Sequence, residues 1–368
     1  MAVKKQRLST REVIENAEKI FHGIRWKYGI VVCPYCGSMN ICEHEGYHYK
    51  CNSCKKRFSD RTKTLMHGSK LSIKVWMQAI YEMFTDNFIS SITLSKKLGI
   101  NQKSAWLLQT KLRYAMDMDK YILNGIIAQD EMYVGGCLSN YHYERKLRLL
   151  RSKGLLEEDR RDYTKSAIYA LNSELKQPVF GMNDGNNVVL YATPNPIKKE
   201  YIHYIYKKHT TGEDNVVVSD ESKLYDNWEE ITGSKLSTNN HHNNQYTTEE
   251  GYTSNRIENT FSWFKRGFGA RITHCKYYQF YLNEFCFRYN NRHRTHKERF
   301  ELILGDTIGK TITYKDIKAY KQYYGFKTKK QYKRHIYTMS EIEDMLKYSC
   351  VEYVQIGETK YYRKDFIK

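Results

Sequence analysis

Three acidic residues far apart in the sequence have the surroundings expected of a shared metal site. Asp130 and Asp220 each follow a short apolar run, in IIAQDE and VVVSDE, and Glu258 lies in a segment with helical periodicity. A carboxylate at the end of a buried strand is held rigidly, and Mg²⁺ or Mn²⁺ binds a few such oxygens together with water and phosphate. Ions held there would activate water or a 3′-hydroxyl for phosphoryl transfer. We therefore expect a catalytic metal site at Asp130, Asp220 and Glu258.

Neighbouring side chains compete for this site or support it. Glu131 and Glu221 follow the two aspartates directly, but side chains alternate along a strand, so we expect them on the opposite face and rank them second. Asn255 precedes Glu258 by three residues and shares its helical face, which leaves open which of the two is the third ligand. Lys265 follows Glu258 by seven residues, on the same face, and is expected to hold a phosphate.

Four of the nine cysteines form two Cys-x-x-Cys pairs, at Cys33, Cys36, Cys51 and Cys54. Two residues between thiolates let a tight turn aim both sulfur atoms at one ion, and two such turns complete the tetrahedral shell that suits Zn²⁺. The flanks VVCPYCG and YKCNSCKKRF predict strands around each pair. We therefore expect a zinc ribbon with a structural metal, because four protein ligands leave no position open for chemistry. A redox pair is the alternative, and Cys42 and His44 are interpreted as loop residues.

Composition points to a polyanionic partner. The chain has 60 Lys and Arg against 41 Asp and Glu, a net charge of +19, and a pI near 9.3. Neutralising phosphates releases counterions, so nucleic acid is the first candidate; the alternative is a basic protein without such a partner. The 33 Tyr, 14 Phe and 5 Trp argue against wholesale disorder. The sequence has neither an apolar run long enough for a membrane span nor a secretory signal, so we expect a cytoplasmic protein associated with the nucleoid.

The segment after the ribbon has the pattern of a DNA-reading unit. Apolar spacing predicts a helix over 71–84, a second helix over 89–99 that ends at Gly99, and a third helix capped by Asn101. Helix, short turn and helix is the helix-turn-helix outline, with a plain helical bundle as the alternative. The N-terminal end of the third helix would contact DNA through Gln102, Lys103 and Ser104.

From about residue 125 strands and helices alternate. The sequence predicts strands at 166–171, 178–182, 187–192 and 215–222 and helices at 197–209, 254–268 and 276–294. This order predicts an α/β fold with an RNase H-like mixed sheet and flanking helices, preceded by a zinc ribbon and a helix-turn-helix segment. The charged insertion 139–165 is interpreted as a helical hairpin or a loop near DNA. The expected divisions are an N-terminal helix and zinc ribbon (1–65), a helix-turn-helix segment (66–122), a catalytic domain (123–306) and a basic accessory module ending in a helix and a β-hairpin around Gly357 (307–368).

Three motifs resemble a known family. DEMYVGG, residues 130–136, resembles the DE-x-Y-x-GG signature of bacterial insertion-sequence transposases related to the eukaryotic Merlin elements. NRIENTFSWFKRGFG, residues 255–269, resembles the family's N-x-x-E…W…KRG-x-x-G segment, and FCFRYNNR, residues 285–292, resembles its EF-x-FRYN-x-R ending. The resemblance covers roughly residues 20–300 and includes the order of ribbon, helices and core.

The resemblance implies DDE-type polynucleotidyl transferase chemistry on double-stranded DNA. Water would hydrolyse a phosphodiester at each transposon end, and the freed 3′-hydroxyl would attack target DNA. By motif, the metal ligands would be Asp130, Asp220 and Glu258, with Lys265 and Arg266 on DNA. A homo-oligomer is expected in the synaptic complex, since two ends are handled together. The alternatives are a non-catalytic DNA-binding regulator derived from a transposase and a structure-specific nuclease.

Overall fold

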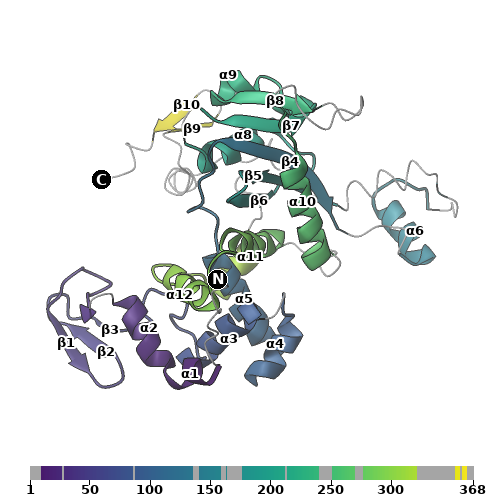
Figure 1. The fold of residues 1–368 in the computed structure, drawn as a ribbon. Coiled ribbons are helices and arrows are strands. Elements are labelled where there is room, and N and C mark those ends of the chain that lie inside the picture. The colour runs from purple at the N-terminus through teal and green to yellow at the C-terminus, as the bar shows by residue number, and fades with distance from the viewer. Residues whose placement is uncertain are drawn as a thin grey trace, which may run out of the picture.

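The computed structural model describes residues 10–26, 29–85, 88–135, 141–158, 163, 176–211, 214–239, 251–269, 277–320, 353–356 and 359–362. These residues form a small three-stranded ribbon, a body of helices, and a five-stranded sheet with helices packed on it (Figure 1). The strand expected at 166–171 lies outside the described residues.

The N-terminal part is a small ribbon preceded by two short helices, the second of which contacts it. Its elements are α1 (Thr10–Glu15), α2 (Ala17–Arg25), β1 (Ile41–His44), β2 (His48–Cys51) and β3 (Arg57–Ser59). The three strands are antiparallel in the order β1-β2-β3. Buried Asp60 accepts a hydrogen bond from Trp26 Nε1 at 2.7 Å and lies 3.0 Å from His22 Nδ1, which ties α2 to the ribbon.

Two details of the ribbon correct the sequence prediction. The strand expected before Cys33 does not form, because Val31 and Val32 pack into the small ribbon core without a strand partner among the described residues. Cys42 and His44 are not loop residues: both lie in β1, where they are exposed and sit opposite Lys50 and His48 of β2.

The three helices predicted after the ribbon are confirmed. They are α3 (Ile73–Thr85), α4 (Ser91–Leu98) and α5 (Gln102–Ala115). Ser90 caps α4 by accepting from the backbone N–H of Thr93 at 3.0 Å, and Gly99 ends it in the left-handed conformation with φ of 64°. Asn101 caps α5 by accepting from the backbone N–H of Ser104 at 2.8 Å. Local side-chain chemistry thus fixes the tight turn between α4 and α5.

The central sheet has the order β6-β5-β4-β7-β8. Its strands are β4 (Ile126–Val134), β5 (Gln177–Asn183), β6 (Val188–Ala192), β7 (Val216–Asp220) and β8 (Lys235–Asn239). β4, β5 and β6 form an antiparallel meander, and β7 and β8 run parallel to β4. The apolar runs of the sequence become strands buried on both faces. This arrangement confirms the mixed α/β, RNase H-like fold class.

Helices cover the sheet and join it to the helical body. They are α8 (Lys199–His209), α9 (Trp228–Thr232), α10 (Asn255–Phe264) and α11 (Tyr278–Asn290). α10 is shorter than the predicted 254–268, because its last turn widens into the π-helical turn η5 (Lys265–Gly269). α11 likewise is shorter than the predicted 276–294. It packs on β6 and on α5, so it lies between the sheet and the helical body (Figure 1).

A buried charged network crosses this junction. Glu284 of α11 is fully buried and accepts from Arg113 Nε of α5 at 2.7 Å and from Arg288 Nη2 at 2.8 Å. Burial raises the pKa of Glu284, but the two guanidinium charges outweigh burial and leave it below its ordinary value. Removing one partner of such a network leaves an uncompensated charge, so the junction specifies how α5 sits on α11.

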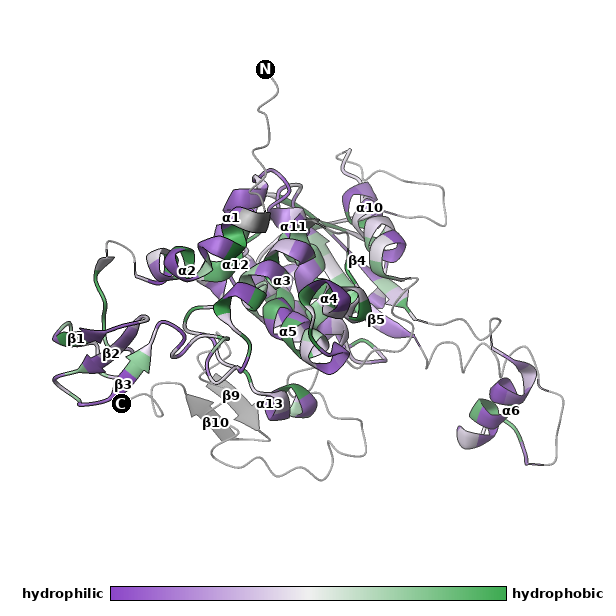
Figure 2. Cartoon of the chain, turned by 90° about the horizontal axis from the view of Figure 1, so that it is seen from below, coloured by the Kyte–Doolittle hydropathy of each residue, from purple (hydrophilic) through white to green (hydrophobic). Residues whose placement is uncertain are grey.

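Two helices that the sequence analysis did not predict complete the helical body. α12 (His296–Asp306) and α13 (Tyr314–Ala319) each begin with a capping box, at Thr295 with Glu298 and at Thr313 with Asp316. Figure 2 shows α12 beside α2 and α3, and its apolar side chains share one hydrophobic cluster with theirs. The domain boundaries expected after residues 122 and 306 remain a proposal, based on the change in sequence character at those positions.

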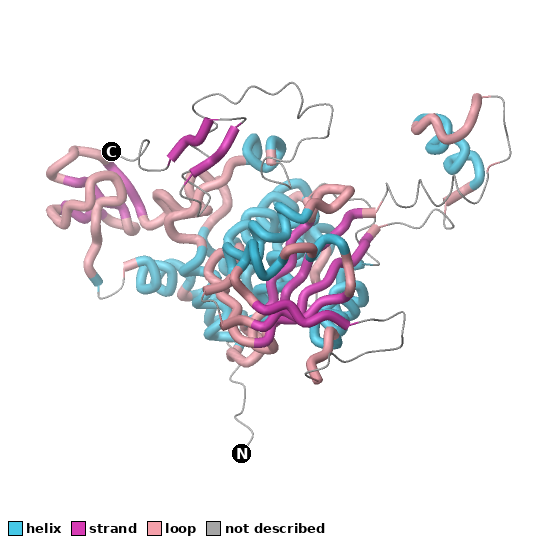
Figure 3. Tube along the Cα trace, turned by 90° about the horizontal axis from the view of Figure 1, so that it is seen from above, coloured by secondary structure: helices cyan, strands magenta, loops and turns pink. Residues whose placement is uncertain are grey.

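The insertion and the tail each contain regular structure. α6 (Tyr143–Ser152) buries Leu147 and Leu150, and Leu150 lies in a small hydrophobic cluster separate from the others. The helix stands apart from the sheet (Figure 3). The tail hairpin is confirmed as β9 (Tyr353–Ile356) paired antiparallel with β10 (Thr359–Tyr362). Among the described helices, none has both the length and the apolar character needed to cross a membrane.

Candidate active site and zinc centre

The register of two parallel strands brings two of the predicted acids to the same level. The paired residues of β4 and β7 are Ile126 with Val216, Ile127 with Val217 and Ala128 with Val218. Continued along both strands, this register brings Asp130 level with Asp220. The sequence predicted that both strands end at their acids. β7 does end at Asp220, but β4 continues past Asp130 and Glu131 to Val134, paired with β5. The carboxylates therefore meet where the two strands part.

Glu131 also belongs to this cluster, contrary to the expectation from strand alternation. Ligand oxygens of Asp130, Glu131 and Asp220 all lie within 4.8 Å of one another. Alternation fixes where each Cβ points, but it does not fix the end of a long side chain at a place where the neighbouring strand stops. Tyr225, which follows β7 in the 3₁₀ turn η3 (Lys223–Tyr225), donates a hydrogen bond to Glu131 Oε1. Glu221 is exposed and outside this group of described residues.

The raised pKa values of two carboxyl groups in the cluster show that their negative charges are not balanced by nearby positive charges. Burial raises the pKa of Asp130 to about 7; the backbone N–H of Glu131 opposes the shift, and the charges of Asp220 and Glu258 add to it. Burial likewise raises the pKa of Glu131 to about 7, against the hydrogen bond from Tyr225. Half-buried carboxylates this close repel one another, so a divalent cation among them would relieve the repulsion.

Helix α10 and the turn after it carry the third predicted acid and the predicted lysine, but Glu258 is not among the described carboxylates that lie within 4.8 Å of one another. The charge of Glu258 raises the pKa of Asp130 and the charge of Lys265 lowers it, so both groups lie within electrostatic range of Asp130. Glu258 is exposed and is oriented by Ser254, whose Oγ donates to Glu258 Oε1 at 2.6 Å. Asn255 is also exposed, at the first residue of α10.

Gly181 allows α10 to approach the sheet beside Asp130. It lies opposite Asp130 on β5. A Cβ at this position would lie 2.7 Å from Leu190 Cδ2, 2.7 Å from Phe261 Cε1 and 2.9 Å from Ile257 Cδ1. Ile257 and Phe261 belong to the buried face of α10. The missing side chain therefore sets how closely the helix that carries Glu258 packs on β4 and β5.

Replacing Gly181 with alanine is expected to push α10 away from the sheet. Overpacking of this kind costs about 1–3 kcal/mol of unfolding free energy, and Mn²⁺ affinity should fall because Glu258 moves with α10. Urea unfolding and Mn²⁺ titration measure both effects. Gly305→Ala is the matched control, since Gly305 is helical and its Cβ would meet nothing within 4 Å. Equal stability of the two variants would contradict the packing argument.

Replacing Tyr225 with phenylalanine is expected to weaken metal binding without unfolding the protein. The change removes the hydroxyl that orients Glu131, and loss of such a supporting hydrogen bond typically costs about 10–100-fold in metal affinity. Tyr206→Phe is the control: Tyr206 is also buried and also packs on Trp228, but its hydroxyl bonds Ser234 Oγ at 2.8 Å. Mn²⁺ titration of the two variants should separate them, and equal affinities would remove Glu131 from the site.

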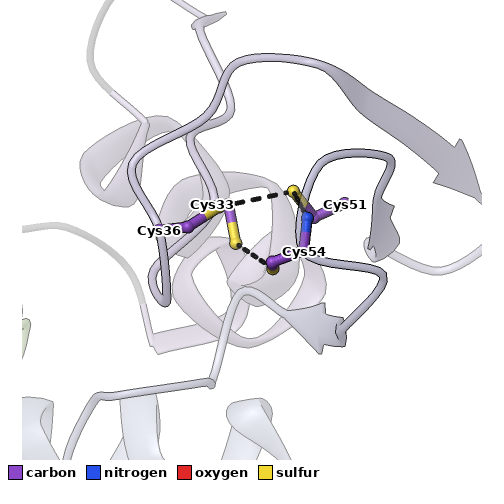
Figure 4. Close-up of side chains that lie close together, drawn as sticks. All are labelled: Cys33, Cys36, Cys51 and Cys54. Carbon is purple, nitrogen blue, oxygen red and sulfur yellow. Dashed lines mark hydrogen bonds between the residues drawn. The ribbon is translucent and has the colours of Figure 1, made fainter.

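The four predicted cysteines converge on one point in the ribbon (Figure 4). Cys33 Sγ lies 3.6 Å from Cys54 Sγ, and Cys36 Sγ lies 3.6 Å from Cys51 Sγ. Four sulfurs around one Zn²⁺ at about 2.3 Å are about 3.8 Å apart, whereas a disulfide needs about 2.05 Å. The backbone N–H of Cys54 helps to lower the pKa of the Cys51 thiol to about 6, which favours the ligating thiolate. The cluster fits structural zinc and not a redox pair.

The residues predicted to contact DNA lie at two places on the surface. Gln102 and Lys103 are exposed at the N-terminal end of α5, and Ser104 is half-buried there. Gln102 Nε2 donates to Ser91 Oγ of α4 at 2.8 Å. Lys265 and Arg266 are exposed at the start of η5, and the charge of Lys265 acts on Asp130.

A four-cysteine ribbon, a helical body and an RNase H-like sheet with acids at the divergence of its parallel strands define the DDE transposases as a class. Residues 122–290 match the family described as ISXO2-like transposase domain, and residues 15–57 match the transposase zinc-ribbon domain. These two matches place a transposase zinc ribbon ahead of an ISXO2-like transposase domain in this chain.

A relative from Halobacterium salinarum is described as an uncharacterized protein in transposable element ISH50. It is 25% identical over 215 residues, which cover 57% of this chain and 68% of the relative. No solved structure matches the chain.

Proposed function

We propose that the chain binds the terminal inverted repeats of its own element and catalyses metal-dependent DNA cleavage and strand transfer. The observation that supports this most directly is the meeting of Asp130, Glu131 and Asp220 at the end of β7. A basic protein with a purely binding role has no need of three carboxylates held in mutual repulsion, whereas a phosphoryl transferase uses such a group to hold metal.

Each site residue has a role in this proposal. Mg²⁺ or Mn²⁺, when bound, would polarise the scissile phosphate and lower the pKa of the attacking water or 3′-hydroxyl. Asp130 and Asp220 would hold the cation from the sheet, and Glu258 would complete the site from α10, with Ser254 orienting its carboxylate. Glu131 is a further ligand candidate, and Asn255 is the alternative to Glu258. Lys265 would hold a phosphate oxygen of the cleaved strand.

Binding of DNA is assigned to both basic regions. The N-terminal end of α5, with Gln102, Lys103 and Ser104, would read the terminal repeat in the major groove, and the ribbon would add backbone contacts. Lys265 and Arg266 would contact the DNA that enters the active site. Two ends must be cut together, so the working form would be a homo-oligomer acting on nucleoid DNA in the cytoplasm.

The test is an assay of the purified full chain with DNA that carries both ends of its element, in Mg²⁺ or Mn²⁺. We expect metal-dependent breaks at the element ends and products in which those ends are joined to target DNA. Breaks without joined products would favour a structure-specific nuclease. Binding of the ends without breaks would favour a non-catalytic regulator.

Metal binding is expected to strengthen as the pH rises. Asp130 and Glu131 have pKa values raised to about 7, so below that pH each must lose a proton before it binds metal. Affinity for Mn²⁺ should rise with pH through this range and level off above it, by up to about tenfold per pH unit for each proton released. Titration calorimetry in buffers of different ionisation enthalpy measures both affinity and proton release. Affinity independent of pH across this range would contradict the expectation.

A further inference from the structure

One side chain of the helical body reaches out of its own core and into the core of the sheet. Phe88 lies in the connection between α3 and α4. The flanking residues Phe84 and Ile89 are buried in the hydrophobic cluster of the helical body, whereas Phe88 packs against the cluster of the sheet. Its ring centroid lies 3.5 Å from that of Phe268. The segment that leads into the predicted DNA-reading helices therefore touches the catalytic half of the molecule.

The surface that Phe88 contacts is the π-helical turn that begins at Lys265. A Cβ on Gly267 would lie 2.6 Å from Phe88 Cε2, so the ring occupies the space left by the missing side chain. Phe268, the next residue, stacks on Phe264 of α10 with ring centroids 5.3 Å apart. Single π-helical turns are uncommon and often lie at functional sites. Here the turn carries Lys265, whose charge acts on Asp130, and Phe88 packs against its third and fourth residues.

The backbone at Phe88 indicates that this contact is imposed by the surrounding structure. Phe88 has a φ of 59°, in the left-handed region. That conformation is unfavourable for a residue with a side chain and persists where the neighbouring packing holds it. The guanidinium of Arg288 lies 5.0 Å from the Phe88 ring and bonds the carbonyl oxygen of Met83 in α3. Arg288, which is paired with buried Glu284, therefore contacts the Phe88 ring and helps to hold it in place.

We propose that Phe88 is a positioning residue: it holds the turn Lys265–Gly269 in place, and so links the helices that read the transposon end to the lysine that faces the metal site. The catalytic part of this inference rests on the proposed function. The contact between Phe88 and the turn is independent of it.

The first experiment needs no activity. Amide hydrogen exchange of residues 265–269 is compared in the wild-type full chain, Phe88→Leu and Phe84→Leu. Both variants replace an aromatic ring that packs on the guanidinium of Arg288 in α11. Phe88 also contacts the turn, whereas Phe84 packs on Phe287 with ring centroids 5.6 Å apart. Phe88→Leu should speed exchange of the turn on the order of tenfold, and Phe84→Leu should not. Equal exchange in all three proteins would overturn the inference.

The second experiment asks whether Phe88 acts through Lys265. Phe88→Leu should slow DNA cleavage on the order of tenfold with end binding unchanged, and should cause no further loss in a Lys265→Ala background, because residues that act as one unit are not additive. Phe88→Tyr, which keeps the ring, should restore the rate. An equal loss in both backgrounds would show a general structural role and overturn the inference. A wild-type chain that never cuts DNA would reject the proposed function, while hydrogen exchange would still decide the contact.

Discussion

Asp130→Ala is expected to abolish DNA cleavage and strand transfer, with a loss of at least about a thousandfold in rate, because the site would lose a carboxylate proposed to hold metal against the scissile phosphate. Asp220→Ala should have the same effect, since the two residues lie at one level of the sheet where β7 ends. Binding of end DNA should be unchanged, because α5 and the ribbon contain neither residue. Gel-based cleavage and strand-transfer assays beside a binding assay measure both quantities.

The stability of the Asp130 variant separates a metal site from a structural cluster. The raised pKa of Asp130 reflects its burial and the nearby charges of Asp220 and Glu258. Removing one of the repelling carboxylates should leave the free energy of unfolding equal or higher in the absence of metal. Glu221→Ala is the matched control: this residue is adjacent to Asp220 but exposed and outside the group, and it should cut normally. Strand transfer retained in Asp130→Ala would remove the catalytic assignment.

Removal of zinc is expected to unfold the ribbon and leave the sheet intact. The ribbon core consists of a few side chains around Trp26, Tyr49 and Phe58, too few to fold a segment of this size alone. Structural zinc supplies on the order of 10 kcal/mol to such domains. Cys51→Ser or chelation should therefore abolish zinc binding, expose the amides of 33–59 to exchange, and weaken binding of end DNA by about a hundredfold or more.

Cys42→Ser provides the control for the zinc experiment. Cys42 is exposed in β1 and is not one of the four converging thiols, so its replacement should leave zinc content and hydrogen exchange unchanged. Amides of β4 and β5 should stay protected in every ribbon variant, since these strands lie in a separate hydrophobic cluster. A ribbon that stays protected after complete chelation would show that metal does not hold it together.

The sequence was sufficient to predict the elements that have strong local signals. The capped helices α4 and α5, the apolar strands β5, β6 and β7 and the paired cysteines all depend on residues close together in the chain. The capping boxes at Thr295 and Thr313 are signals of the same kind, and attention to them would have predicted α12 and α13. β8 has the sequence KLSTN, which has neither a long apolar run nor a clear alternation. It was not predicted because it depends on pairing with β7 and not on a local sequence signal.

The remaining features of the site depend on register, which is not a local property. Asp130 and Asp220 were predictable because each follows an apolar run, but their common level depends on how β4 aligns with β7. Glu131 was expected on the opposite face, but its carboxylate lies with those of Asp130 and Asp220 at the point where β7 ends. Tyr225 had no signal in the sequence. Gly181 did, since glycine inside a strand often marks close approach of another segment, but which segment approaches is decided by tertiary packing.

The salt bridges of Glu284 with Arg113 and Arg288 fix α5 against α11, and so against the sheet. In the proposed function, in which α5 reads the transposon end, the dimensions of the protein would set the number of base pairs between the recognised sequence and the cleaved phosphodiester. An element that gained or lost a few base pairs in that interval would turn its cleavage point around the double helix and out of reach, so drift in the element's ends is constrained by protein shape as well as by base identity.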